Sequence, residues 1–85
     1  MDRRRLLERL RKGHVQNVDF AAFCDLLEGL GFHCVRIKGS HHHFRRPGLP
    51  EKMTVQPDRG KAKPYQIRQL LGLIEDYNLR LEGRS

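Results

Sequence analysis

The sequence predicts an α+β fold in which a three-stranded antiparallel sheet is covered on one face by helices. Three observations predict it. Apolar stripes at helical spacing lie on either side of the middle of the chain, the middle alternates at strand spacing, and glycine or proline turns separate the strands. The 85 residues suffice for one small domain with a modest core.

Two helices are expected before the strands. The first covers residues 1–12 and ends at Gly13, and its apolar side consists of Leu6, Leu7 and Leu10. The second begins after Asp19, a residue type that favours the N-cap position, and ends at Gly29 and Gly31. Its apolar stripe, predicted to lie in the core, consists of Phe20, Phe23, Cys24, Leu27 and Leu30.

Three strands are expected in the middle of the chain, over residues 32–38, 41–46 and 52–56. The first two are joined by the tight turn Gly39-Ser40, which predicts an antiparallel hairpin. Two prolines and a glycine exclude a strand over residues 47–50. A second turn is expected over residues 57–60, after the third strand.

A last helix is expected from Pro64, because proline suits the first helical position. Its apolar stripe consists of Ile67, Leu70, Leu71, Ile74 and Tyr77. Residues 1–17 are predicted to form a basic helical extension and residues 18–82 the domain proper. Double-stranded-RNA-binding domains share the helix, three strands, helix arrangement, and in such an arrangement one face of the sheet stays in contact with water.

The charge is uneven along the chain. The net charge is +7, and residues 36–63 carry eight Arg or Lys against two acidic residues. A basic segment of this kind attracts a phosphate backbone. Cys24 and Cys34 form no Cys-x-x-Cys pair, which excludes a zinc ribbon or a thioredoxin-type site. No apolar run reaches the length of a membrane span or of a secretory signal, so we expect a cytoplasmic protein.

Strand alternation separates the three adjacent histidines. Phe44 is expected to face the core, and its neighbour two residues back, His42, shares that face. The opposite face then carries His41, His43 and Arg45, which point to solvent or substrate. The alternation therefore favours His41 or His43 for chemistry and gives His42 a structural place.

Cleavage of RNA requires a base that removes the proton of a 2′-hydroxyl so that its oxygen attacks the adjacent phosphorus. An imidazole suits this step because its ordinary pKa is about 6.5. Nearby cations, among them Lys38, Arg45 and Arg46, would hold the phosphate. Adjacent histidines in a strand cannot all face one ion, and no acidic or cysteine ligand lies close in sequence, so no metal site is expected.

Two stretches of the chain resemble the core signature of the HicA family. The first is Leu-Leu-Glu-Gly-Leu-Gly-Phe over residues 26–32, and the second runs over residues 35–44 and contains Gly39-Ser40-His41. Residues 54–57 and 60–69 are similar to the third strand and final helix of one HicA branch. The resemblance extends from about Phe20 to Leu79.

The resemblance implies a fold similar to the double-stranded-RNA-binding domain and the activity of a toxin that cleaves messenger RNA. HicA proteins act without a known metal or other cofactor. The family's catalytic histidine follows Gly-Ser and corresponds to His41, in agreement with the alternation argument. The usual partner is HicB, an antitoxin protein that covers the active face of the toxin.

The resemblance has two departures. Short HicA members begin close to Asp19, so the preceding helix is an extension that could bind RNA, pack on the domain or contact the antitoxin. Many members also carry Pro-x-His after the third strand, where this chain has Pro57-Asp58-Arg59.

The predicted site has His41 as the catalytic base. The residues expected to bind RNA are Lys38, Gly39, Ser40, His43, Arg45 and Lys61. Whether His43 also assists the chemistry is left open by the sequence. Two alternatives remain: a non-catalytic RNA-binding module of the same fold, and an interaction domain whose basic face binds an acidic protein.

Overall fold

The computed structural model describes residues 2–82, which form three helices, a three-stranded sheet and a small two-stranded sheet. The helices are α1 (Arg3–Arg11), α2 (Phe20–Gly29) and α3 (Pro64–Tyr77). The strands are β1 (His33–Lys38), β2 (His41–Arg45), β3 (Met53–Val55), β4 (Pro57–Asp58) and β5 (Lys61–Ala62).

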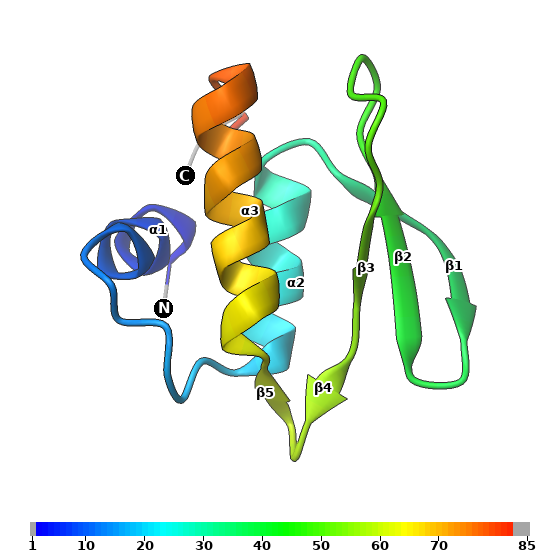
Figure 1. The fold of residues 1–85 in the computed structure, drawn as a ribbon, viewed down its shortest axis with the longest axis horizontal. Coiled ribbons are helices and arrows are strands. Elements are labelled where there is room, and N and C mark those ends of the chain that lie inside the picture. The colour runs from blue at the N-terminus through cyan, green and yellow to red at the C-terminus, as the bar shows by residue number, and fades with distance from the viewer. Residues whose placement is uncertain (1, 83–85) are drawn as a thin grey trace.

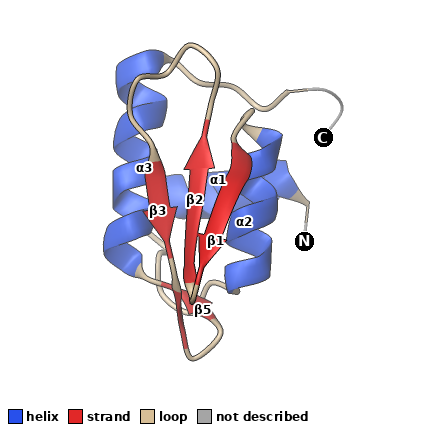
Figure 2. Cartoon of the chain, turned by 90° about the vertical axis from the view of Figure 1, so that its right-hand side faces the viewer, coloured by secondary structure: helices blue, strands red, loops and turns tan. Residues whose placement is uncertain are grey.

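The elements form three layers (Figure 1). The sheet of β1, β2 and β3 is covered on one face by α2 and α3, which lie side by side, and α1 packs on the far side of those two helices. The opposite face of the sheet is open (Figure 2). The α+β fold class, the three-stranded antiparallel sheet and the single helical cover are confirmed.

Helix α1 belongs to the same core as the rest of the chain. The side chain of Asp2 caps the helix by accepting a hydrogen bond of 2.8 Å from the backbone N–H of Arg5, and Gly13 follows the helix with φ 95°. Its apolar side chains are buried with those of α2, the sheet and α3: Leu6, Leu7 and Leu10. The predicted extension is therefore packed onto the domain.

Helix α2 begins at the predicted place, with Asp19 as its N-cap residue. The Asp19 carboxylate, however, does not cap the helix but accepts a hydrogen bond of 2.6 Å from Lys61 Nζ. In α3, Tyr77 was expected in the apolar stripe but is exposed. Its hydroxyl donates a 2.7 Å hydrogen bond to Glu51 at the surface. The left-handed residue Asn78 ends α3, with φ 53°.

The three-stranded sheet has the order β1-β2-β3, and both neighbouring pairs are antiparallel. Phe44, Met53 and Val55 are buried against the helices. Strand β1 is an edge strand whose residues are all exposed, and Val35 and Ile37 keep 59% and 60% of their accessible surface. The core thus lies under β2 and β3.

The predicted turn over residues 57–60 is tighter than expected, because Pro57 and Asp58 form strand β4 and pair with β5. Only Arg59 and Gly60 turn, with φ 54° and 79°, the two positive values that a type I′ hairpin turn requires. The N–H of Phe20 donates to the Gly60 carbonyl at 2.9 Å, which fixes the start of α2 beside this hairpin. Within the described residues, no helix has the length and apolarity needed to cross a membrane.

Candidate active site

The predicted site lies on the open face of the three-stranded sheet, which faces the viewer in Figure 2. Residues directly opposite each other in an antiparallel pair share a face. Lys38 pairs with His41, and His43 lies between Arg36 on one side and Thr54 on the other. The register therefore brings these five side chains onto the surface that the helices do not cover.

His42 lies on the other face of the sheet, as strand alternation predicts. It pairs with Val55, which is buried, and its ring contacts that of Phe20 edge to face, with centroids 5.0 Å apart and planes at 65°. The adjacent Phe44 is buried. His42 thus packs against the start of α2, and its neighbours His41 and His43 point away from the helices.

A β-bulge in β1 sets which of its residues join the open face. Cys34 pairs with Phe44 and Arg36 with His43, so Val35 is an extra residue without a partner of its own. In an unbroken ladder Cys34 would lie opposite Arg45 on the open face. The bulge returns Cys34 to the core side, while Arg36 stays beside His43.

His43 is held by a neighbouring strand. Its Nδ1 lies 3.1 Å from the hydroxyl oxygen of Thr54 in β3, at hydrogen-bond distance, and both side chains are partly buried. The hydroxyl can donate to a neutral Nδ1 or accept from a protonated one. In either case Nε2 is the ring nitrogen left for other partners.

The surroundings of His43 favour its neutral form. Partial burial lowers the pKa of His43, and the positive charges of Lys52, Arg36, His41 and Lys38 lower it further. These charges come from both neighbouring segments of the sheet as well as from β2 itself. The same cations make the open face a surface to which a phosphate group is attracted.

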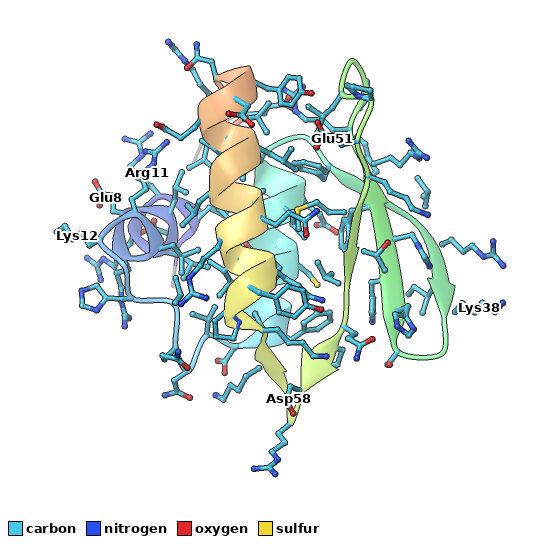
Figure 3. All side chains as sticks on the ribbon, viewed as in Figure 1. Glu8, Arg11, Lys12, Lys38, Glu51 and Asp58 are labelled. Atoms are coloured by element: carbon cyan, nitrogen blue, oxygen red, sulfur yellow. The ribbon has the colours of Figure 1, made fainter. Side chains whose placement is uncertain are left out.

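The turn between β1 and β2 positions His41. Gly39 and Ser40 join the two paired residues Lys38 and His41 directly, and Gly39 has φ 60°. A single glycine at the first central position is typical of a type II′ hairpin turn. Lys38, at the end of β1, points away from the body of the molecule (Figure 3), so its ammonium group is accessible.

Other predicted cations have different surroundings. Arg45 is on the open face opposite His33, and its guanidinium reaches the Pro50 carbonyl at 3.4 Å. Lys61 lies in the separate β4–β5 hairpin, paired with Asp19. Arg46 donates to the Leu30 carbonyl at 2.8 Å and contacts Glu82 at 3.2 Å. The structure thus brings Arg45 to the site and leaves Lys61 and Arg46 apart from it.

Three residues of the open face were missed by sequence reasoning: Arg36, Lys52 and Thr54. The strand pairing places Arg36 and Thr54 on either side of His43, and Lys52, just before β3, lowers the pKa of His43 by its charge. A sequence signal exists for Arg36 alone. The polar residues of β1 fall at positions 33, 36 and 38, and the spacing of three followed by two indicates a bulge.

The open face is chemically suited to a phosphodiester. It combines two imidazoles on one strand with cations on both sides, and histidine is the side chain best suited to proton transfer near neutral pH. Over residues 2–82, no three His, Cys, Asp or Glu side chains come close enough together to hold a metal ion.

One comparison with known proteins identifies a family that the chain matches. A family model described as the HicA toxin of bacterial toxin–antitoxin systems matches residues 20–76, more than half of the chain. The matched region runs from α2 through the sheet and nearly to the end of α3, and α1 precedes it. Searches of curated proteins and of solved structures find no match.

Proposed function

Since the chain belongs to the HicA toxin family of bacterial toxin–antitoxin systems, whose members are generally ribonucleases, we propose that it cleaves messenger RNA at the open face of its sheet. The reaction we propose depends on His41 and needs no metal ion. The family supplies the reaction class. The exposure of His41 at the end of a basic hairpin supports the choice of residue.

In the proposed reaction His41 is the general base. It takes the proton of a 2′-hydroxyl, and the oxygen attacks the adjacent phosphorus to form a 2′,3′-cyclic phosphate while the bond to the 5′-oxygen breaks. The step requires an imidazole that the sugar edge can reach. His41 is exposed and points away from the helices, which fits this requirement.

The neighbouring residues bind the RNA backbone in this proposal. Lys38 and Arg45 contact phosphates, and the Gly39-Ser40 turn offers backbone and hydroxyl groups to the phosphate beside His41. Lys61 contacts an RNA phosphate farther from the cleaved linkage. To do so, its ammonium group leaves the ion pair with Asp19. Single-stranded RNA fits such an exposed surface because its sugars and phosphates are accessible.

The partner that controls this activity is, we propose, a HicB-like antitoxin that covers the open face. Family membership supports an antitoxin partner. An acidic surface on the antitoxin would complement Arg36, Lys38 and Arg45 of the open face. Because the proposed substrate is messenger RNA, the proposed place of action is the cytoplasm.

The test is RNA cleavage in the presence of EDTA by the wild-type protein and by His41→Gln, with RNA binding measured in parallel. We expect His41→Gln to bind within about threefold of wild type and to cleave at least about 100-fold more slowly, the range for loss of a general base. Binding by both proteins with cleavage by neither would mean that the chain is an RNA-binding module and not a ribonuclease. Equal cleavage by both would remove His41 from the mechanism.

A further inference from the structure

The cleavage step leaves one proton unassigned. When the bond between phosphorus and the 5′-oxygen breaks, that oxygen carries a developing negative charge, and a group on the enzyme can protonate it. His41, as the base, accepts a proton in the same step. In the Pro57-Asp58-Arg59 segment, Arg59 stands where many family members have the histidine of Pro-x-His, so a second imidazole would come from elsewhere in the chain.

We propose that His43 is the second catalytic imidazole and acts as the general acid, with Thr54 as the residue that positions it. The inference rests on the proposed function, since it assigns a role within the same reaction. His43 lies two residues from His41 on the same face of β2, so both rings can reach one phosphodiester.

The contact with Thr54 distinguishes His43 from the other histidines of the open face. The 3.1 Å approach of the Thr54 hydroxyl to Nδ1 leaves Nε2 as the nitrogen that carries the transferable proton. A ring that is partly buried and hydrogen-bonded across two strands loses less conformational freedom in the transition state than a free one. His33 shares the open face, opposite Arg45, and is exposed.

The proton balance of the step is complete. His41 takes the proton of the 2′-hydroxyl, the 2′-oxygen bonds to phosphorus, the bond from phosphorus to the 5′-oxygen breaks, and protonated His43 gives its Nε2 proton to the 5′-oxygen. The products are a 2′,3′-cyclic phosphate and a 5′-hydroxyl. His41 then loses a proton to water and His43 regains one.

The first test changes the leaving group. The substrates are an RNA oligonucleotide that the wild type cuts at one linkage and the same oligonucleotide with sulfur in place of the 5′-oxygen of that linkage. Sulfur leaves as a thiolate and needs no proton. We expect His43→Gln to cleave the oxygen substrate about 100-fold more slowly than wild type and the sulfur substrate within about fivefold, whereas His41→Gln is slow on both.

The matched control is His33→Gln, which removes another histidine from the open face and should cleave both substrates like wild type. An equal deficit of His43→Gln on both substrates, or no deficit on either, would overturn the inference and leave the proposed function intact. A wild-type protein that cleaves neither substrate would overturn the proposed function and this inference together.

The second test measures the pH dependence of kcat/KM, which reports the free enzyme. The lowered pKa of His43 puts the break that this group contributes to the profile on the acidic side of the usual histidine range. Lys52→Gln removes one of the positive charges, raises the pKa of His43, and should move this break to higher pH. A profile with the same breaks in Lys52→Gln and in the wild type would contradict the role of His43.

The third test addresses Thr54. Thr54→Val keeps the shape of the side chain and removes the hydroxyl, so we expect about tenfold slower cleavage of the oxygen substrate, the value of one lost hydrogen bond. The sulfur substrate should be little affected, and Thr54→Ser should restore the rate. A loss that is equal on both substrates would show that Thr54 supports only the fold.

Discussion

Gly39 controls the hairpin that carries His41 through one backbone angle. Its φ is 60°, and an added Cβ would find no heavy atom within 4 Å, so the whole cost of a side chain there is backbone strain. We expect Gly39→Ala to lower the free energy of unfolding by about 1 kcal/mol or more. Cleavage should also fall, because the strained turn is followed directly by His41. Thermal unfolding and RNA cleavage of the same preparation measure the two effects.

Gly72 provides the opposite case and the control. It lies within α3, its φ is in the ordinary range, and an added Cβ again meets nothing within 4 Å. Gly72→Ala should therefore raise the stability by roughly 0.5–1 kcal/mol, the helical preference for alanine over glycine. Two glycine substitutions with the same sign would contradict the backbone argument.

Asp25 makes part of the stability depend on pH. Its carboxylate accepts hydrogen bonds from Arg3 at 3.0 and 2.8 Å, and this pairing lowers the pKa of Asp25. The stabilisation is present above the unfolded pKa of about 3.9 and is lost as the pH falls through the lower folded value. We expect Asp25→Asn to reduce the drop in melting temperature between pH 5 and pH 2 to some extent. An identical acid dependence of both proteins would show that the pair contributes nothing.

At the scale of elements, the helices follow from the sequence because each has an apolar stripe with a period of 3.6 residues. The bounds of α2 and α3 agree closely with those expected, because Gly31, with φ 94°, follows the end of α2 and Pro64 occupies the first turn of α3. The β4–β5 hairpin was seen only as a turn. Two residues are too few to show alternation, and their pairing depends on the contact with the start of α2.

The candidate site also has features that the sequence predicts and features that it does not. Alternation within one strand was enough to separate His41 and His43 from His42, since the period of two needs no knowledge of the partner strands. The contact between His43 and Thr54 joins residues that are eleven positions apart, and it depends on the register of β2 on β3. The position of Arg36 depends on the bulge. Both are properties of strand pairing, which local patterns do not determine.

Helix α1 is expected to be essential for stability. Leu10 retains only 1% of its accessible surface and packs in the same cluster as residues of α2 and α3. Leu10→Ala should therefore lower the free energy of unfolding by about 2–5 kcal/mol, as for other buried leucines. Denaturant unfolding measures this loss. A change below about 0.5 kcal/mol, typical of surface positions, would mean that α1 is a dispensable appendage.

At the scale of the whole molecule, two basic surfaces lie on opposite sides. The open face of the sheet carries Arg36 and Lys38. Helix α1 lies beyond the other helices (Figure 1), and it carries exposed Arg9 and is followed by exposed Lys12. One phosphodiester at His41 can contact only the first surface.

This separation predicts unequal effects of charge removal. The double variant Arg36→Gln/Lys38→Gln should weaken RNA binding and reduce the slope of log K against log salt by roughly 0.7 for each lost phosphate contact. The matched variant Arg9→Gln/Lys12→Gln removes the same charge from α1 and should leave the slope nearly unchanged. Binding titrations over a range of salt concentrations measure the slope for each variant. Equal slopes for both variants would mean that RNA also contacts α1.

The position of α3 in the sequence determines when the open face can fold during synthesis. The residues of the open face lie between positions 33 and 54, but the sheet that holds them is buried against α3, which comes last. A nascent chain that ends before Pro64 would contain His41, His43 and Thr54 without the cover that fixes their register. The open face therefore assembles only after α3 has been synthesised.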